Sequence, residues 1–497
     1  MGHDAIVVGS GVAGMTAGIV LAREGLRTLV LEQAPQPGGL MRSYVRDGYR
    51  FSTGVHTVGA LGEGQVLWRY LKYLGVLERL SPVALDAEAP VELVFPDRSF
   101  LVPSAAGAFR ERLLGEFPRE RRAIDAFFAE QRRAVGLFPL YGFRPDVERL
   151  PAELRDVSVK AYLDGLTACE PLKGILSAIH PFYGTDPAEC PLYVHFLVFD
   201  SLLTGCWRFD EGRAPLAGAF VAALRAVGGQ VRCGARVAAI ESSEGTVRGV
   251  RLAGGERVEA GTVVFTGHPK QLAALCAGGG LRHAYLERVA AQPESVGMFG
   301  AAIAWEGAEC CLRTRDVLVY MDTAASRGCP ACMALGVEPV PALVCSAGRG
   351  PEAGRHAAIG LAPVPPEEWQ AWKATGGGAR PADYEAAKQR LAERILGVFR
   401  RLWPHAAGGM RIVDSFSPLT VRDHTLSPLG SAYGLRKSTR PGFNGSISTA
   451  TRVHGLVLAG QSIVLPGVVG TVIGSVDACA SIVGRRRLIE RIARETE

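Results

Sequence analysis

The stretch IVVGSGVAG, residues 6–14, constrains the fold of this chain more than any other segment. The apolar run Ala5–Val8 predicts a short buried strand, and the residues after the glycines have helical spacing. Gly9, Gly11 and Gly14 therefore fall at a turn from strand to helix. A tight bend, close approach of the backbone to a pyrophosphate and close helix packing each call for a residue without a side chain there.

The residues on either side of this turn strengthen the prediction of a dinucleotide site. Val12 and Ala13 open the helix, where free amides and the positive helix end face the phosphates. A second apolar strand, Thr28–Leu31, leads to Glu32 and Gln33, about 20 residues further on. An acid at that position accepts hydrogen bonds from ribose hydroxyls and disfavours a 2′-phosphate. The alternative is a glycine turn that binds no nucleotide.

Length and charge set broad limits on the rest of the chain. With 497 residues, the chain is long for one domain, so two lobes or one domain with a large insertion are expected. A hydrophobic content of 48% suffices for a large core. The formal net charge of +6 is modest and unclustered, so we expect no nucleic-acid partner.

The eleven cysteines lack the spacing of a disulfide framework, and no secretory signal precedes the first strand. We therefore expect a reduced, cytoplasmic compartment. Cys329 and Cys332 form a C-x-x-C motif without a second pair to complete a zinc site. Ordinary thiols in a loop are favoured over a metal or redox site, and no metal is expected.

The stretch from Gly455 to Gly484 carries one charged residue, Asp477, and is long enough to cross a membrane. Internal glycines and Pro466 argue against a membrane span. They divide the stretch into a strand, Leu456–Ala459, then a loop and a helix. We therefore predict a buried strand, loop and helix.

Three separated segments resemble one enzyme family. They are the glycine turn, PQPGGLMRSYVRDGYRFSTGVHTVG at 35–59 and LVLAGQSIVLPGVVGTVIG at 456–474. Together they are similar to the FAD-dependent phytoene desaturases, carotenoid isomerases and all-trans-retinol 13,14-reductases (retinol saturases). The forms GVHTVG and AGQ…GVVG are nearer to the isomerase and saturase branch. The resemblance is weakest from about residue 300 to residue 400.

This resemblance implies that the dinucleotide is FAD and assigns further residues to it. A helix that begins near Val469 and Gly470, after Gly467, would direct its positive end at the group before it. If that group is the flavin N1 and O2 edge, the helix stabilises the reduced cofactor. The other implied contacts are Gly38 and Gly39 with Arg42 nearby, the main chain around Val237 at the adenine, and Gly460 with Gln461 beside the ribityl pyrophosphate.

The resemblance also implies the architecture. The fold class is α/β, with a Rossmann-like FAD-binding domain of the glutathione-reductase and amine-oxidase type and an inserted α+β substrate domain. We expect the discontinuous FAD-binding domain to comprise residues 1–80, 210–290 and 410–497. Residues 81–209 and 291–409 would form the substrate domain.

The implied reaction is saturation or cis-trans isomerisation of a conjugated, isoprenoid-like polyene by reduced flavin, with desaturation or amine oxidation as alternatives. Saturation needs a proton donor beside the flavin. His56 is one candidate, and its alternative role is to shape the flavin pocket through hydrogen bonds to backbone. Tyr433 is the second candidate, because a phenol can donate a proton from an apolar site. The family's aromatic residue after the histidine is replaced by Thr57.

An apolar, lipid-like substrate requires an apolar cleft. The aromatic passage at 178–207 suits its wall, although each aromatic residue there could equally fill a core. His195 and Asp200 lie in the same passage and are interpreted as hydrogen-bonded core groups rather than polar anchors for the substrate. The aromatic candidates are Phe182, Tyr183, Phe196 and Phe199.

The sequence leaves two partners open: the electron donor and a membrane surface. No second dinucleotide motif is visible, so a separate protein reductant is favoured over a nicotinamide as electron donor. The end of the chain, RRRLIERIARETE at 485–497, predicts a basic amphipathic helix. Peripheral contact with a membrane surface is one role for it, and packing as an ordinary terminal helix is the favoured alternative.

Overall fold

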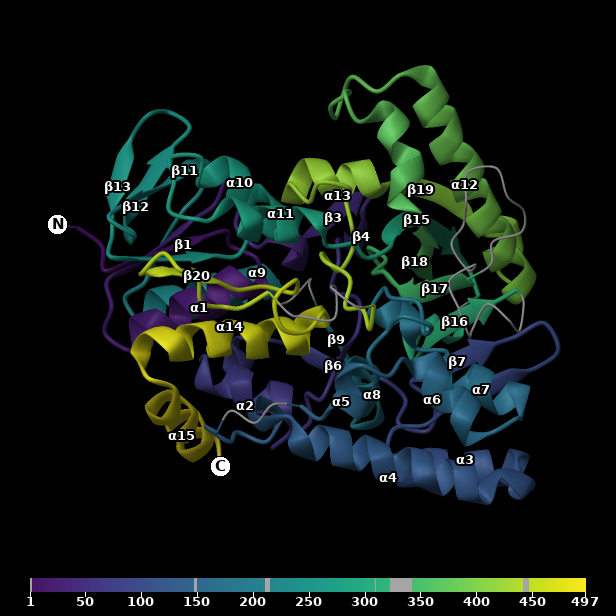
Figure 1. Cartoon of the computed structure of the whole chain (residues 1–497). Helices are drawn as coiled ribbons and strands as arrows, with labels where there is room; N and C mark the ends of the chain where they lie inside the picture. The colour runs from purple at the N-terminus through teal and green to yellow at the C-terminus, as the bar shows by residue number, and fades with distance from the viewer. Residues whose placement is uncertain (1, 147–149, 211–214, 309, 322–341, 441–446) are drawn as a thin grey trace.

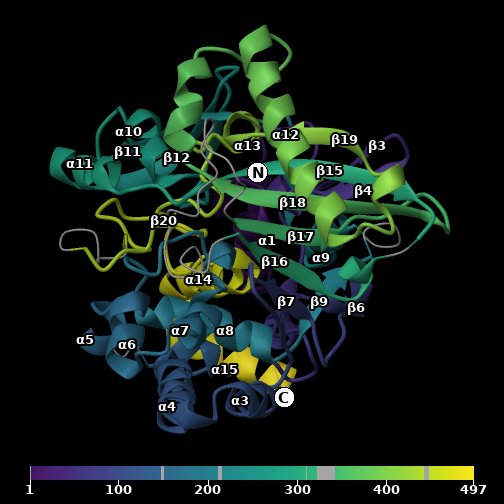
Figure 2. The same ribbon diagram turned by 90° about the vertical axis from the view of Figure 1, so that its right-hand side faces the viewer.

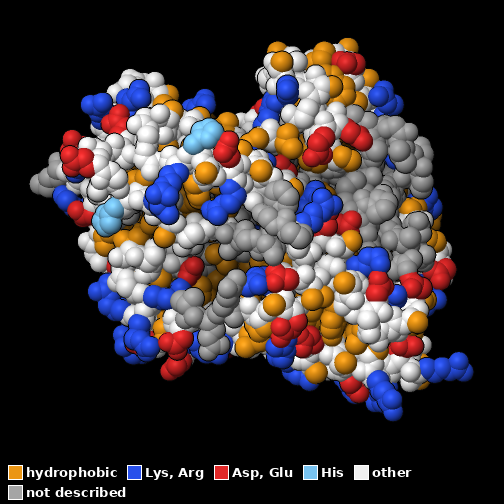
Figure 3. Space-filling model, in the orientation of Figure 1, with side chains coloured by type: hydrophobic (Ala, Val, Ile, Leu, Met, Phe, Trp, Pro, Cys, Tyr) orange, Lys and Arg blue, Asp and Glu red, His pale blue; other side chains and the backbone are white. Residues whose placement is uncertain are grey.

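The computed structural model describes residues 2–146, 150–210, 215–308, 310–321, 342–440 and 447–497. Two sheets and their covering helices form the body of the molecule, and a helical region lies along one side of both (Figures 1 and 2). Positive and negative side chains are interspersed over the face in Figure 3. Cys329 and Cys332 lie outside the described residues.

A five-stranded parallel sheet carries the glycine turn. Its order is β10-β2-β1-β14-β20, so the first strand of the chain lies in the middle. The structure confirms the strands predicted at Ala5–Val8 and Thr28–Leu31 and the predicted α/β class. The strands are β1 (Ala5–Val8), β2 (Thr28–Leu31), β10 (Gln230–Arg232), β14 (Thr262–Phe265) and β20 (Leu456–Leu458).

Helices cover one face of this sheet, and a small antiparallel sheet covers the other. Helix α1 (Val12–Arg23) packs between α14 (Gly467–Val483) and α9 (Leu216–Ala226). The opposite face shares one apolar core with the strands of the small sheet. These strands are β11 (Val237–Ser243), β12 (Thr246–Leu252) and β13 (Arg257–Glu259). The helices α10 (Leu272–Leu275) and α11 (His283–Ala291) come after β14 in the chain.

The second large sheet is mixed and has seven strands in the order β19-β15-β18-β17-β16-β7-β8. Helix α12 (Ala382–Leu402) packs on it. Strand β19 (Arg411–Phe416) belongs to this sheet, although the expected FAD-binding range began at 410. The domain boundaries stay a prediction. The other strands are β7 (Val91–Val94), β8 (Ser99–Val102), β15 (Gly297–Glu306), β16 (Asp316–Tyr320), β17 (Ala342–Ala347) and β18 (Arg355–Val364).

The helical region packs around α8 (Leu192–Leu203), whose apolar residues face a cluster of phenylalanines. Its other helices are α3 (Ala106–Glu116), α4 (Arg121–Leu137), α5 (Ala152–Arg155), α6 (Val159–Leu166) and α7 (Glu170–Ser177). The connecting elements are β3 (Ser43–Arg46), β4 (Tyr49–Ser52), β5 (Val58–Gly59), α2 (Val66–Tyr73), β6 (Pro82–Ala84), β9 (Cys206–Phe209) and α13 (Pro418–Thr425).

The C-terminal stretch folds as the predicted strand, loop and helix. Strand β20 lies at the sheet edge, and α14 packs against α1. Among the described residues, no helix combines the length and apolar character needed to cross a membrane. The final helix, α15 (Arg485–Thr496), buries Leu488, Ile489 and Ile492 against the protein, so this apolar face is occupied within the fold.

Candidate functional site

A cavity of about 400 Å³ opens where β1, β2 and β14 end and where α1 and α14 begin. Parallel α/β sheets bind ligands at this edge, outside the carboxyl ends of their strands. The cavity continues past the glycine turn to a wall formed by α8. The predicted residues that line it are Gly9, Gly11, Val12, Ala13, Glu32, Gln33, Gly39, Val237, Tyr433, Gly460, Gln461, Gly467, Val469 and Gly470.

The three glycines of the turn have different structural roles. A Cβ atom on Gly14 would lie 1.8 Å from the carbonyl oxygen of Gly9, so Gly14 permits close packing of α1 on the end of β1. A Cβ on Gly11 would meet no atom within 4 Å, because it would point into the cavity. Gly9 has a φ of 100°, which other residues rarely adopt. The backbone at Gly11 is therefore open to a ligand.

Glu32 lines the cavity, and its carboxylate is held by hydrogen bonds from the chain itself. Ser10 donates to Oε2 through its main-chain N–H at 2.9 Å, and Ala34 donates to Oε1 at 2.8 Å. The hydroxyl of Ser10 also bonds Oε2 and accepts from the N–H of Gly38 at 2.9 Å. Ser10 thus ties the glycine turn to the loop at Gly38, a role that the sequence reasoning missed.

The second helix to begin at the cavity is α14. It starts at Gly467, slightly earlier than the predicted start near Val469 and Gly470. A Cβ on Gly467 would meet no atom within 4 Å. The side chain of Gln461 donates to the carbonyl of Ala432 at 3.2 Å and so connects this segment to the loop before Tyr433.

These features fit a dinucleotide with a flavin. Two helices direct their N-terminal ends at the cavity, which favours a negative pyrophosphate or an anionic ring edge. Gly11 and Gly467 leave space where side chains would stand, and Glu32 offers acceptors for ribose hydroxyls.

Four of the predicted site residues do not line the cavity: Gly14, Gly38, Arg42 and His56. Gly38 packs beside Ala217, and Arg42 donates from Nε to the carbonyl of Gly39 at 3.0 Å. Both therefore shape the loop at Gly39, which does line the cavity.

His56 lies next to Thr57, and of these two neighbours only Thr57 lines the cavity. Burial lowers the pKa of His56 to about 4, so its ring is neutral at pH 7. The charges of Asp316 and Arg208, which form an ion pair with each other, also act on the pKa of His56: Asp316 raises it and Arg208 lowers it. The role of His56 as proton donor stays a prediction, which this orientation and this pKa disfavour.

Tyr433 lines the cavity, and its hydroxyl donates to the carbonyl of Pro181 at 3.0 Å. Burial raises the pKa of this phenol above its usual range, so the group stays protonated at physiological pH. The main-chain N–H of Tyr433 donates to the hydroxyl of Ser295 at 3.0 Å. Gly184 packs against the ring so closely that a Cβ there would lie 2.4 Å from it.

The far wall of the cavity is mostly apolar. Phe182 belongs to it, whereas the other aromatic candidates Tyr183, Phe196 and Phe199 are buried in the core. Among the described lining residues, Glu32 is the only carboxylate, and it lies at the opposite end from this wall. The wall comprises Tyr141, Phe182, Leu197, Val198, Ser201, Leu202 and Val468, and the Ser201 hydroxyl donates to the carbonyl of Val198 within α8 at 2.7 Å.

His195 and Asp200 lie behind this wall. His195 is fully buried, bonds the hydroxyl of Tyr183 through Nδ1 at 3.1 Å, and has its pKa lowered to about 3 by burial. Asp200 accepts from Nε2 of Gln131 at 2.7 Å, and burial raises its pKa. Neither residue lines the cavity, which agrees with their interpretation as hydrogen-bonded core groups.

The structure adds lining residues that the sequence did not indicate. Thr266 and Gly267 follow β14, and Gln271 follows them closely. Residues 424–426, at the end of α13, border the cavity near Gln33. The signal for Thr266 and Gly267 was their place directly after a buried strand, whereas nothing local marks residues 424–426.

Two relatives align with nearly the whole chain, and a third aligns with about half of it. All-trans-retinol 13,14-reductase of Macaca fascicularis is 26% identical over 540 residues, spanning 98% of this chain and 86% of the relative. The human protein of the same name is 25% identical, with the same coverage. Hydroxyneurosporene desaturase of Rubrivivax gelatinosus is 28% identical over 299 residues, 54% of each chain.

Solved structures share the fold at lower identity. An oxidoreductase from Methanosarcina mazei superposes with a TM-score of 0.66 at 16% identity, covering 95% of this chain and 99% of its own. A putrescine oxidase variant gives a TM-score of 0.66 at 15% identity and covers 99% of both chains.

Residues 12–295, more than half of the chain, match the family described as flavin containing amine oxidoreductase. This match begins at the helix of the glycine turn and includes Glu32 and the apolar wall on α8. The chain therefore belongs to the family of flavin-containing amine oxidoreductases and is an FAD-dependent oxidoreductase.

Proposed function

We propose that this enzyme saturates or isomerises carbon–carbon double bonds of an apolar conjugated polyene with reduced FAD. The observation that carries the proposal is the apolar wall, which continues directly from the flavin end of the cavity. A polyene offers no charge or amide to bind, so its site must exclude water through apolar surface. The names of the retinol reductases and the carotenoid desaturase point to the same substrate class.

We assign the residues of the cavity to FAD as follows. Glu32 would bind the ribose of the adenosine half, and the main chain at Val237 would border the adenine. The amides at the start of α1 would bind the pyrophosphate, and the start of α14 would face the flavin. Gly39, Gly460 and Gln461 would line the path between these groups.

Bound in this cavity, reduced FAD would provide hydride chemistry for saturation, and a protein group would have to give a proton to the other carbon of the double bond. Tyr433 is the group that we assign to this step, because its hydroxyl is protonated and its side chain lines the cavity. The hydroxyl now donates to the carbonyl of Pro181, so it would have to turn from Pro181 toward the substrate to give up its proton, and solvent would return a proton to the phenolate after the product leaves. The wall around Phe182 and Leu197 would hold the polyene and keep water out.

Amine oxidation is the competing function suggested by the family name and by the putrescine oxidase fold. A protonated amine would be stabilised by a carboxylate or a tight aromatic cage. Among the described residues, the wall near Tyr433 presents no carboxylate to the cavity. Four aliphatic side chains, Leu197, Val198, Leu202 and Val468, stand beside its aromatic rings, so the composition of the wall favours a neutral, apolar substrate over a tight aromatic cage.

The test is anaerobic incubation of the photoreduced holoenzyme with all-trans-retinol and, separately, with a linear carotenoid. A mass gain of two hydrogens identifies saturation, and an unchanged mass with altered chromatographic retention identifies isomerisation. A loss of two hydrogens with the oxidised enzyme identifies desaturation. Turnover of simple amines, without any change in either polyene, would overturn the proposal.

A matched pair of variants tests whether the apolar wall is the substrate site. Val198 lines the cavity, so Val198→Asp should abolish polyene turnover while FAD stays bound. Val83 is 51% exposed on β6, and Val83→Asp should leave turnover unchanged. Equal losses in both variants would show that the wall is not the substrate site.

A further inference from the structure

The end of the cavity at Glu32 and Gln33 is bordered by a segment that comes from far along the chain. This segment, residues 424–426, forms the end of α13. Gln271 donates from Nε2 to the carbonyl of Leu426 at 2.7 Å, and Gln33 reaches the carbonyl of His424 at 3.5 Å. Two side chains of the nucleotide-binding sheet region therefore contact this segment at the rim of the cavity.

The last turn of α13 is held in an uncommon conformation. Leu426 has a φ of 59°, in the left-handed region that residues with a side chain seldom adopt. Such a conformation persists where the surrounding structure holds it. Here it turns the carbonyl of Leu426 toward Gln271, so the contact at the rim depends on this turn.

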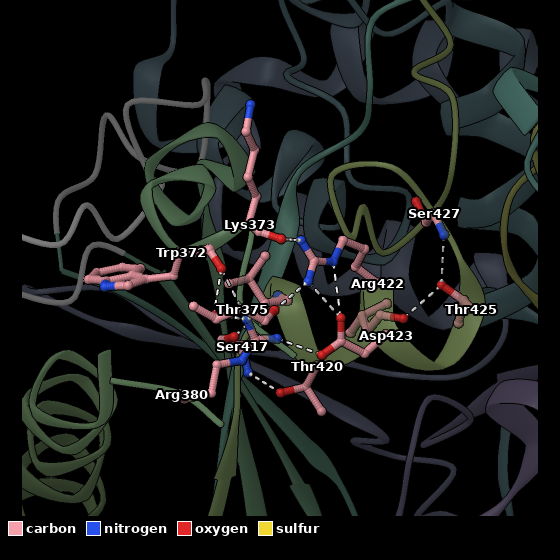
Figure 4. A network of polar contacts seen from close by, with 12 residues as sticks. Trp372, Lys373, Thr375, Arg380, Ser417, Thr420, Arg422, Asp423, Thr425 and Ser427 are labelled. Carbon is pink, nitrogen blue, oxygen red and sulfur yellow. Dashed lines mark hydrogen bonds and ion pairs between the residues drawn. The ribbon is translucent and has the colours of Figure 1, made fainter. Parts of the chain in front are cut away.

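On its other side, α13 is anchored by a network of charged and polar groups (Figure 4). Asp423 accepts from Arg380 at 2.5 Å and from Arg422 at 2.7 Å. Arg422 also donates to the carbonyls of Lys373 at 2.7 Å and Thr375 at 3.2 Å. The network thus fastens the C-terminal half of α13 to the chain at Lys373–Arg380.

Asp423 is the shared member of this network. The side chain of Arg380 is 5% exposed, so its charge depends on the Asp423 carboxylate for compensation. The start of α13 is fixed separately, by a capping box between Ser417 and Thr420. Loss of the Asp423 charge should therefore loosen the end of α13 and leave its start in place.

We propose that the end of α13, residues 424–426, closes the adenosine end of the FAD site and slows release of the cofactor. Asp423 acts as a positioning residue, because it holds this segment through Arg380 and Arg422 without lining the cavity. The proposal rests on the assignment of Glu32 to the adenosine ribose and is independent of the substrate class. Its test is therefore separate from the test for polyene turnover.

The experiment compares FAD release from holoenzymes after dilution, followed by flavin fluorescence. We expect Asp423→Asn to release FAD roughly three- to tenfold faster than the unmodified enzyme. The control is Asp414→Asn. Asp414 pairs with Arg46 at 3.1 Å and is 31% exposed, close to the 26% of Asp423, but it lies on β19 and not on α13.

A double variant tests whether Asp423 acts through the contact at the rim. Gln271→Leu removes the bond to Leu426 from the other side, so Asp423→Asn should add little to its effect. Effects that multiply would overturn the proposal, as would release at the unmodified rate by Asp423→Asn or equal acceleration by Asp414→Asn. If Asp423→Asn does not fold, Arg422→Lys supplies the same comparison, because a lysine cannot make all three of its contacts.

Discussion

The phenol of Tyr433 and the main-chain carbonyl of Pro181 are joined by a hydrogen bond of 3.0 Å at the edge of the cavity. Pro181 directly precedes Phe182 of the apolar wall, so this bond links the proposed proton donor to the proposed substrate site. The bond holds the hydroxyl toward Pro181 until a substrate competes for its proton, and burial keeps the phenol protonated by raising its pKa.

The first prediction concerns this hydroxyl. Tyr433→Phe should lower the rate of polyene saturation about 100-fold, because a positioned proton donor typically contributes this much or more. FAD content should not change. Rapid anaerobic mixing of photoreduced enzyme with polyene measures the rate through flavin absorbance.

A second tyrosine supplies the control for Tyr433→Phe. Tyr70 is fully buried and donates to the carbonyl of Leu140 at 2.7 Å, but it does not line the cavity. Tyr70→Phe should therefore leave the rate unchanged. An unaltered rate in Tyr433→Phe would exclude its hydroxyl as the donor.

Two glycines of the turn should respond differently to alanine. Gly11→Ala places its Cβ in the open cavity, so the fold should keep its stability while FAD affinity falls roughly tenfold. Gly14→Ala should destabilise the fold itself, because its Cβ would lie 1.8 Å from the oxygen of Gly9. Urea unfolding of flavin-free protein and flavin titration separate the two effects. Equal losses of stability would contradict the assignment of Gly11 to the ligand.

The pKa of His56 predicts a pH dependence of stability. Burial lowers this pKa from 6.5 to about 4, so the unfolded chain binds a proton below pH 6.5 that the folded chain does not bind. Stability should therefore fall with pH between 6.5 and 4. At pH 5 the contribution is on the order of 2 kcal/mol.

His56→Gln removes this contribution. Urea unfolding of both proteins at pH 7 and pH 5 should show a loss on acidification that is smaller in the variant by about that amount. The ring is neutral above pH 6.5, so His56 should cause no inflection in the pH–rate profile between pH 6.5 and 8. Identical pH dependence in the two proteins would contradict the low pKa.

The last helix should contribute to the core. Leu488 is fully buried in the apolar cluster that includes residues of α1, α2 and α14, so Leu488→Ala should lower the free energy of unfolding by about 2–4 kcal/mol. Arg494 is exposed on the same helix, and Arg494→Ala should have little effect. Urea unfolding measures both, and a negligible effect of Leu488→Ala would show that α15 is loosely attached.

The sequence predicted the features that depend on local pattern. Strands Ala5–Val8 and Thr28–Leu31 were predicted with their observed bounds, because a short apolar run followed by a turn signal is sufficient. The strand, loop and helix of the C-terminus were predicted because glycine and proline interrupt the apolar stretch. The glycine spacing indicated the ligand edge of the sheet.

The direction of individual side chains was decided by the tertiary structure. His56 and Thr57 are neighbours in the segment 35–59 that resembles the FAD-dependent enzymes, yet Thr57 lines the cavity and His56 does not. Phe182 reaches the cavity, while Phe196 and Phe199 fill the core beneath it. Neighbouring residues of one segment point to different sides, and the partner on each side comes from elsewhere in the chain.

The sequence by itself determined a Rossmann-like α/β unit with a dinucleotide edge, because strands, helix starts and glycine turns follow from residues close to one another. Only the tertiary structure decided that residues 424–426 border the nucleotide end and that Tyr433 meets Pro181. These contacts join segments more than 150 residues apart (Gln271 and Leu426, for example, are 155 apart). The packing of the two large sheets and their covering helices brings such segments together, and no local pattern encodes it.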